Sequence, residues 1–306
     1  MQEITKLPRL KPRKADSHKG DYGRVLVLAG SVGYTGAAYL CAKAALRTGS
    51  GLVTLGIPQS LNAIMEVKLT CVMTHPLPET TQHTLSDKAR DEVLKLAQDA
   101  DVVAIGPGLS THPNTRRLVL ALLQMLDKPI VLDADGLNVI AGDLYVLDKV
   151  QREIVLTPHP GEMARLLALP SAEEVQRSRL KVAMKFAERE GLVLVLKGHQ
   201  TLVTDAQLVY MNTTGNPGMA TAGAGDVLTG MIASLIGQGY TAFQAAQLAV
   251  YLHGLAGDIA ATRRGQMTMI ATDILDALPR AFAAMTKAPK ASTTTKSKDA
   301  TDSHSR

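Results

Sequence analysis

The chain has 306 residues, 46% of them hydrophobic, enough to bury a large core as one big α/β domain or as two smaller ones. Tryptophan is absent and aromatic residues make up only 3% of the chain, which argues against the base-stacking platforms of nucleic-acid-binding modules. Of the net charge of +5, residues 1–24 carry +4 and residues 287–306 carry +3, which leaves −2 for the body, so we expect solvated basic ends and no nucleic-acid partner.

The lack of a recognisable targeting signal and the pattern of cysteines predict a cytoplasmic protein. The opening residues MQEITKLPRLKPRK lack the apolar run of a signal peptide, and no stretch approaches 18 uncharged apolar residues. Cys41 and Cys71 lie in apolar contexts without CxxC spacing. We expect both to be buried thiols of a reducing compartment, and no membrane span.

Strand-like and helix-like segments alternate along the chain. The apolar run RVLVLA, the glycine turn GSVGYTG, an Ala-rich helix and a second apolar run form the opening unit. In chain order we predict strands over 24–29 and 52–57, a helix over 88–98, the strand DVVAI, a helix over 114–126, the strands PIVL and EIVL, a helix over 172–190, the strand LVLVL, a hairpin turning near Asp205, and helices over 227–237, 242–261 and 273–283. Such alternation predicts a mostly parallel sheet with helices on both faces.

The domain organisation follows from composition. Nothing between residues 19 and 286 resembles a linker, so we expect one domain there, after a basic extension over residues 1–18. The tail KAPKASTTTKSKDATDSHSR is low in complexity, and we expect residues 287–306 to be disordered.

Six segments at the predicted carboxyl ends of strands combine glycine with polar residues. Ligands of open parallel sheets bind at this edge. The segments are GSVGYTGA, GPGLS, DADGLN, TPHPGE, KGHQT and NTTGNPGMATAGAGD. Together they predict one large binding site.

The segment NPGMATAGAGDVLTG carries the chemistry that the residues themselves indicate. Gly223, Ala224 and Gly225 let the backbone approach a ligand, and Asp226 is expected to begin a helix whose free N–H groups bind phosphate oxygens. An acid at this place suits a general base that deprotonates a hydroxyl during phosphoryl transfer. Alternatively, Asp226 is an ordinary helix N-cap.

These motifs together resemble those of the ADP-dependent NAD(P)H-hydrate dehydratases, a branch of the ribokinase-like superfamily. The matching motifs are KGDYGRVLVLAGS, YTGAA, GPGL, LDADGLN, LTPHPGE, LKGHQT and GNPGMATAGAGDVLTG, spread over residues 19–284. The superfamily at large shares a Gly-x-Gly-Asp and a mid-chain carboxylate, whereas TPHPGE and NPGMAT narrow the match to this branch. The resemblance implies a ribokinase-like α/β fold.

The resemblance also implies the repair of damaged nicotinamide cofactors. Family members transfer phosphate from ADP to the extra ring hydroxyl of (6S)-NADHX or NADPHX and then expel it, which yields NADH or NADPH, AMP and phosphate. Phosphate is a far better leaving group than hydroxide. Bacterial members generally use ADP and eukaryotic members ATP, and the overall resemblance favours ADP as co-substrate here, with Mg²⁺ as cofactor.

Site residues are carried over from the family's motifs one by one. Asp226 would contact the hydrated ring as the base. The rest of the NAD(P)HX pocket would come from Ala37, Gly108 and His159. Glu162 would position Mg²⁺ through water, and Asn138 would hydrogen-bond near the phosphates. The adenine nucleotide would lie against Lys197, Gly198, His199, Gln200, Thr201 and Gly225.

Several of these residues have a structural alternative. His159 lies between two prolines and alternatively caps a turn. Glu162 begins a helix, where a carboxylate is favoured in any case. Lys197 alternatively extends its head to solvent beyond an apolar stem. His253 lies on an apolar helix and is expected in the core, and the pair Asp133 and Asp135 is expected to hydrogen-bond at a strand end.

Two other functions use the same motifs. A kinase of the same superfamily, acting on a hydroxymethylpyrimidine, a thiazole or a sugar, would need the Gly-x-Gly-Asp but no pocket for a dinucleotide. A non-catalytic nucleotide sensor would need no base at position 226. The resemblance further implies a homotetramer and, because only about 18 residues precede the match, an NAD(P)H-hydrate epimerase on a separate chain.

Overall fold

The computed structural model describes residues 2–147 and 152–287. The strands are β1 (Gln2–Glu3), β2 (Arg24–Leu28), β3 (Leu52–Pro58), β4 (Met73–Leu77), β5 (Val102–Ile105), β6 (Ile130–Leu132), β7 (Ile154–Leu156), β8 (Val193–Leu196), β9 (Leu202–Thr204) and β10 (Leu208–Met211). The helices are α1 (Thr35–Thr48), α2 (Asn62–Lys68), α3 (Arg90–Gln98), α4 (Pro113–Met125), α5 (Asp135–Ile140), α6 (Pro160–Leu166), α7 (Ala172–Arg177), α8 (Arg179–Glu190), α9 (Ala224–Gly237), α10 (Ala242–Arg264) and α11 (Ala271–Lys287).

The strands form one mostly parallel sheet, as the alternation of elements predicts. Their order is β1-β10-β9-β8-β7-β6-β5-β2-β3-β4. The antiparallel pairs β8–β9 and β9–β10 come from the hairpin around Asp205, in which Val209 pairs with Thr204. The central strands β2, β5, β6, β7 and β8 run parallel, so their carboxyl ends share one edge.

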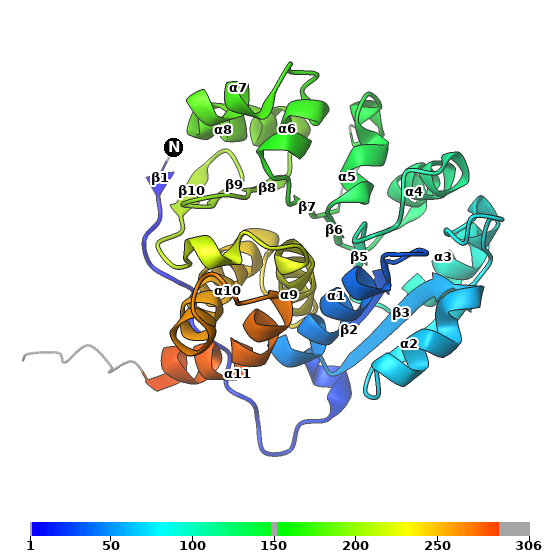
Figure 1. Ribbon diagram of the computed structural model, residues 1–306, viewed down its shortest axis with the longest axis horizontal. Helices are drawn as coiled ribbons and strands as arrows, with labels where there is room; N and C mark the ends of the chain where they lie inside the picture. The colour runs from blue at the N-terminus through cyan, green and yellow to red at the C-terminus, as the bar shows by residue number, and fades with distance from the viewer. Residues whose placement is uncertain (1, 148–151, 288–306) are drawn as a thin grey trace, which may run out of the picture.

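Two helix layers cover the sheet, one on each face (Figure 1). Alternate residues of a strand point to opposite faces. Val25 and Val27 of β2 join the cluster of α1, α9, α10 and α11, whereas Leu26 and Leu28 join the cluster of α3, α4, α5 and α8. This burial on both faces explains why the central strands read as continuous apolar runs.

The basic N-terminal segment lies against the domain, contrary to the expected solvated end. Gln2 and Glu3 pair with β10, and Leu7 and Leu10 pack on the core. The amide of Lys11 donates to Tyr240 Oη at 2.8 Å, and Lys11 Nζ donates to the carbonyl of Gly239 at 2.7 Å. The positive charge is favourable here because the C-terminus of α9 is the negative end of its dipole.

Some other predictions differ from the structure in detail. The expected helix over residues 172–190 is two helices, because Ser178 between α7 and α8 has non-helical backbone angles. Four elements were not predicted from the sequence: β1, α2, β4 and α5. Cys41 is buried but Cys71 is exposed, so the expectation of two buried thiols was half wrong. The predicted disordered tail lies outside the described residues, except for Lys287 at the end of α11.

Within residues 2–147 and 152–287, no helix has the length and apolarity to cross a bilayer.

Candidate active site

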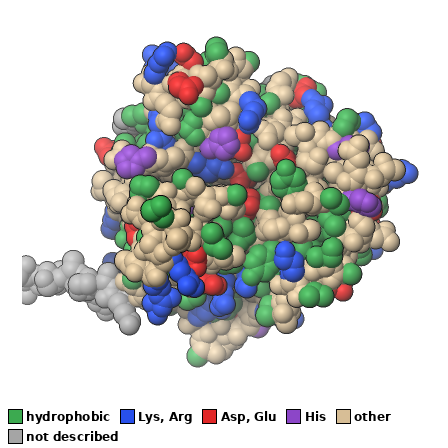
Figure 2. Space-filling view, viewed as in Figure 1, with side chains coloured by type: hydrophobic (Ala, Val, Ile, Leu, Met, Phe, Trp, Pro, Cys, Tyr) green, Lys and Arg blue, Asp and Glu red, His purple; other side chains and the backbone are tan. Residues whose placement is uncertain are grey.

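Five of the strand-end segments meet at one edge of the sheet. β8, β7, β6, β5 and β2 are neighbours in this order, and they lead into KGHQT, TPHPGE, DADGLN, GPGLS and GSVGYTGA. The sixth segment leads into α9, which packs against β2, β5 and β6. On the face in Figure 2, histidine, basic and acidic side chains meet near the centre of the molecule.

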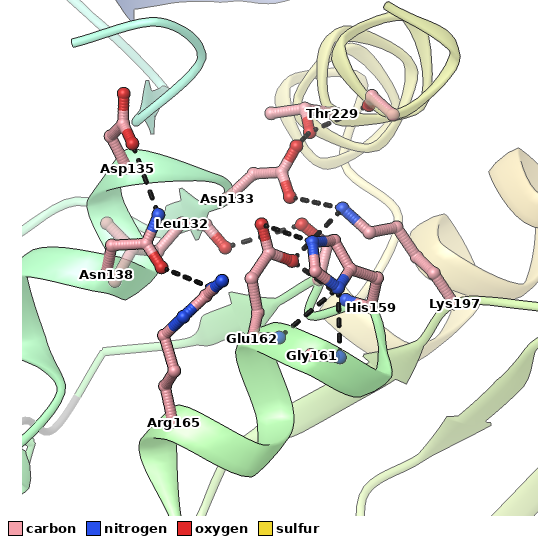
Figure 3. A network of polar contacts seen from close by, with 12 residues as sticks. Leu132, Asp133, Asp135, Asn138, His159, Gly161, Glu162, Arg165, Lys197 and Thr229 are labelled. Carbon is pink, nitrogen blue, oxygen red and sulfur yellow. Dashed lines mark hydrogen bonds and ion pairs between the residues drawn. The ribbon is translucent and has the colours of Figure 1, made fainter. Parts of the chain in front are cut away.

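A buried ion-pair network lies beneath these loops (Figure 3). Asp133, directly after β6, is 1% exposed, and its Oδ1 accepts a hydrogen bond from Lys197 Nζ at 2.7 Å. Its Oδ2 accepts one from Thr229 Oγ1 of α9, also at 2.7 Å. Glu162 Oε2 is 3.6 Å from the same lysine nitrogen. Burial lowers the pKa of Lys197, but the Asp133 and Glu162 carboxylates outweigh it and leave the pKa above its ordinary value.

The start of α9 offers unpaired backbone amides. The helix begins at Ala224 after Gly223, whose φ of +92° lies in the left-handed region, and a Cβ at Gly223 would lie 2.5 Å from Leu40 Cδ1. In the described part of the chain, the amides of Gly225 and Asp226 have no acceptor. Asp226 is therefore the third residue of the helix, not its first residue or its N-cap, and the free amides are suited to an anion.

The carboxyl group of Asp226 is an unusually weak acid. Burial, and next the nearby Asp133 carboxylate, raise its pKa to about 7, against the opposing charge of Lys197. Gly225 directly precedes Asp226 in the chain. A Cβ at Gly225 would lie 3.3 Å from Lys197 Nζ, so the lysine approaches the backbone beside Asp226. A side chain that titrates near neutral pH beside free amides can exchange a proton with a bound ligand.

His159 and Glu162 cap α6 reciprocally. His159 Nδ1 accepts from the amides of Gly161 and Glu162, and Glu162 Oε2 accepts from the amide of His159 at 2.8 Å. Burial lowers the pKa of His159, and a neutral ring that accepts at Nδ1 carries its proton at Nε2. The capping alternative is thus confirmed for both residues, while the half-exposed imidazole keeps an N–H donor at the site.

Ala37, in the first turn of α1, and Gly108, in the loop after β5, lie close together. A Cβ at Gly108 would lie 2.7 Å from Tyr34 Cβ and 3.1 Å from Ala37 Cβ, so the absence of a side chain allows this close approach. Ser31 Oγ donates to the carbonyl of Gly108 at 2.8 Å and joins the loops. Ala37 and Gly108 are therefore neighbours, and their place in a substrate pocket stays a prediction.

The predicted nucleotide loop is the turn between β8 and β9. His199 and Gln200 are exposed, and Thr201 Oγ1 donates to the carbonyl of Gly198 at 2.9 Å. Arg179 of α8 donates to the carbonyls of Leu196, Lys197 and His199 and holds the backbone of this turn. Lys197 faces the buried network, which excludes the alternative that its head extends to solvent.

Asp135 and Asn138 form a second polar chain beside the network. Asp135 Oδ2 accepts from the amide of Ser110 at 2.9 Å, and Asp135 Oδ1 accepts from Asn138 Nδ2 at 3.2 Å. Hydrogen bonding by Asp133 and Asp135 at a strand end is confirmed. His253 is buried as expected, and burial lowers its pKa to about 4.

Comparison with known proteins places these features in a family. The model of the NAD(P)H-hydrate dehydratase family matches residues 25–280. The chain belongs to the NAD(P)H-hydrate dehydratase family. The resemblance of its motifs and the ribokinase-like fold are thereby confirmed.

Individual members of the family are similar over most of the described domain. A bifunctional NAD(P)H-hydrate repair enzyme of Moorella thermoacetica is 52% identical over 277 residues, 90% of this chain and 51% of that protein. An ADP-dependent (S)-NAD(P)H-hydrate dehydratase of Neisseria meningitidis is 38% identical over 85% of this chain and 84% of its own length. The chain spans about half the length of the bifunctional relatives it matches.

A solved member of the family has the same fold. The ADP/ATP-dependent NAD(P)H-hydrate dehydratase of Bacillus subtilis, co-crystallised with ATP and Mg²⁺, superposes with a TM-score of 0.78 at 32% identity. The alignment covers 90% of this chain and 95% of that one.

Several side chains of the site were not predicted from the sequence. Thr229 lies one helical turn after Gly225, a spacing that indicates a shared helix face. Arg165 lies one turn after Glu162 and is available to the same site. Arg179 had no sequence signal, because only the tertiary fold brings α8 to the turn after β8.

The residues of this family member suit a loosely held magnesium ion. Among the described residues, no group of three His, Cys, Asp or Glu side chains could hold a metal. Glu162 Oε2 is engaged in the helix cap, and Oε1, which lies 3.4 Å from His159 Nε2, is the oxygen that would make a water-mediated contact. Mg²⁺ commonly keeps several waters and takes phosphate oxygens as ligands, so this donor set fits it.

Proposed function

We propose that the chain catalyses ADP-dependent dehydration of (6S)-NADHX and NADPHX to NADH and NADPH. The observation that carries the proposal is Asp226, with a pKa raised to about 7 beside unpaired helix amides. Membership of the family supports the reaction. The name of the Neisseria relative, 38% identical, supports ADP as the donor.

The chain's own residues would divide the work as follows. The amides of Gly225 and Asp226 bind oxygens of the terminal phosphoryl group, with the dipole of α9 behind them. Asp226 accepts the proton of the ring hydroxyl. The hydroxyl oxygen attacks the β-phosphorus of ADP, and the bond between this phosphorus and AMP breaks. Phosphate then departs with the electrons of the ring C–O bond, and loss of a proton from the adjacent carbon restores the double bond.

Lys197 would stabilise the charge that moves during this transfer. Its ammonium group lies against Gly225 and is kept protonated by Asp133 and Glu162. A fixed cation at this place is electrostatically favourable where negative charge develops. Mg²⁺, when bound, would neutralise further phosphate charge, and Glu162 would contact it through water.

The two substrates would occupy opposite sides of Asp226. Ala37, Gly108 and His159 would line the NAD(P)HX pocket, and the turn from Lys197 to Thr201 would hold the adenylate. A cytoplasmic location, a homotetramer and an epimerase on a separate chain remain predictions of the sequence analysis.

The proposal is tested by incubating the protein with NADHX and Mg²⁺, with ADP and ATP in parallel. We expect the near-ultraviolet absorbance of reduced nicotinamide to return, and AMP and phosphate to appear with ADP. Turnover only of ATP with a vitamin precursor would establish the small-alcohol kinase instead. Nucleotide binding without any turnover would establish the sensor.

A further inference from the structure

Arg165 on α6 has a neutral side-chain partner. Its Nη1 donates to the amide oxygen of Asn138 at 3.0 Å. In the described part of the chain that is its one hydrogen bond, and no carboxylate lies within ion-pair distance. Six other arginines pair with acids: Arg90 with Asp91, Arg116 with Asp143, Arg117 with Asp87, Arg177 with Glu174, Arg189 with Glu190 and Arg264 with Asp273. The guanidinium of Arg165 thus keeps its full charge and four of its five N–H donors for a ligand.

The neutral partner of Arg165 is itself fixed. Asn138 Nδ2 donates to Asp135 Oδ1, and Asp135 Oδ2 accepts from the amide of Ser110. These hydrogen bonds orient the side-chain amide of Asn138 so that its oxygen faces Arg165 (Figure 3). Asp135 therefore directs the guanidinium through Asn138 without neutralising it. Asn138 Nδ2 keeps its second N–H donor, so a hydrogen bond from Asn138 near the phosphates stays a prediction.

Arg165 lies at the predicted substrate side of the site. It is three residues after Glu162, on the helix that His159 caps, and its charge is close enough to contribute to the lowered pKa of His159. The other charged groups of the candidate site are mostly acids: Asp133, Asp135, Glu162 and Asp226. Of the basic side chains nearby, Lys197 is paired with Asp133, and burial lowers the pKa of His159.

A dinucleotide substrate brings at least two negative charges to these acids. We propose that Arg165 binds phosphate oxygens of the NAD(P)HX substrate, with Asn138 and Asp135 as positioning residues. This inference rests on the proposed function. A guanidinium binds two phosphate oxygens with parallel hydrogen bonds, which a lysine does not reproduce. The phosphate belongs either to the diphosphate bridge or to the 2′-phosphate of NADPHX.

The test compares Arg165→Ala and Arg165→Lys with the parent protein in the NADHX and NADPHX assays. A lost hydrogen bond to a charged group costs about 1.5–3 kcal/mol, so we expect KM for the hydrate to rise about 10- to 100-fold in Arg165→Ala. In Arg165→Lys we expect a smaller rise, with kcat and KM for ADP nearly unchanged in both. Arg177→Ala, which removes an acid-paired arginine of α7, is the control and should change neither KM.

Comparison of the two hydrates identifies the phosphate. Equal rises for NADHX and NADPHX would assign the diphosphate bridge, and a rise for NADPHX alone would assign the 2′-phosphate. Asn138→Ala should raise KM less than Arg165→Ala, and the double variant no more than Arg165→Ala, because Asn138 acts through the arginine. An unchanged KM for both hydrates, or a rise only in KM for ADP, would overturn the proposal.

Failure of the proposed function would be recognised separately. If the parent protein turned over neither hydrate, the dehydratase proposal would fail before any variant was compared. Arg165 would then be tested by calorimetric titration with NADH and NADPH. Weaker binding of either by Arg165→Ala, with unchanged melting temperature, would support the phosphate contact, and unchanged binding of both would overturn it.

Discussion

At Asp226 the surroundings change the chemistry of an ordinary side chain. Burial and the carboxylate of Asp133 raise its pKa to about 7, so it gains and loses its proton near neutral pH. Only the deprotonated form accepts a proton from a hydroxyl. The proposed reaction should therefore slow as pH falls below about 7, with kcat/KM dropping about tenfold per pH unit.

Replacement of the same residue tests its role as base. We expect Asp226→Asn to lower kcat about 10²- to 10⁴-fold, the usual loss with a general base, while calorimetry still detects ADP binding. Asp91→Asn, at an exposed carboxylate on α3, should leave the rate and its pH profile unchanged. A variant with parental activity, or a parent profile that is flat through neutral pH, would contradict the assignment.

The Asp133–Lys197 pair should matter to stability as well as to chemistry. Removing one member of a buried pair leaves an uncompensated charge and costs about 3–5 kcal/mol. Asp133→Ala should fall at the lower end, because Glu162 remains 3.6 Å from Lys197. Addition of Lys197→Met should recover part of the loss, as measured by urea unfolding.

A surface pair supplies the comparison for that measurement. Glu174→Ala removes the partner of Arg177, and both side chains are largely solvated, so the cost should stay below about 1 kcal/mol. Equal losses for Asp133→Ala and Glu174→Ala would show that the buried network has no special role in stability.

At the scale of elements, α10 acts as the support of the loop before α9. Thr214 Oγ1 donates to the carbonyl of Tyr251 at 2.8 Å. Asp258 accepts from the amide of Gly215 and from Asn216 Nδ2. Because this loop ends at the free amides of α9, its attachment to α10 sets where an anion would bind.

Substitution of two glycines of α10 should have contrasting effects on the contact between α10 and the loop before α9. A Cβ at Gly254 would lie 2.7 Å from backbone atoms of Thr214, whereas at Gly257 it would meet only the flexible side chain of Met219. Gly254→Ala should destabilise by about 1–3 kcal/mol through overpacking and weaken ADP binding. Gly257→Ala should be near neutral, since alanine favours the helix and Met219 can move. Thermal melts and ADP calorimetry on both variants decide; similar behaviour of the two would contradict the account.

The N-terminal segment shows how composition alone misplaced an element. Its seven Lys and Arg residues among the first 24 suggest a solvated end. Lys11 and Arg13 instead donate to carbonyls at the C-terminal ends of α9 and α1. The partners lie more than 30 residues away in the sequence, so no local pattern could show them.

At the scale of the whole molecule, the homotetramer stays a prediction, and exposed apolar side chains offer a way to test it. Ile64 and Val67 of α2 and Met73 of β4 lie on adjoining elements and are about half exposed or more. We expect light scattering to give a mass near four times the 32.5 kDa of one chain. Val67→Glu should reduce that mass if this surface forms a contact, because a buried unpaired charge is costly. A monomeric parent protein would contradict the expectation.

The layered fold, the hairpin at Asp205 and the edge of the sheet at which the polar segments meet could all be predicted from local patterns in the chain. Hydrophobic periodicity and glycine placement are local properties, and the parallel connections leave few alternative topologies. The motifs also identified the family. Asp226 was singled out from the glycines that precede it, and the resemblance to the family singled out Lys197, Glu162 and His159.

The contacts between those side chains, and the pKa shifts that result, become visible only in the folded structure. Asp133 binding Lys197, Thr229 reaching back to the same carboxylate, and Arg165 held by a neutral amide all join segments that are distant in sequence. A pKa depends on burial and on charges within a few ångströms, and these distances exist only once the chain has folded. For the same reason the basic N-terminus was placed wrongly, since charge is a property of the sequence but its partners are a property of the fold.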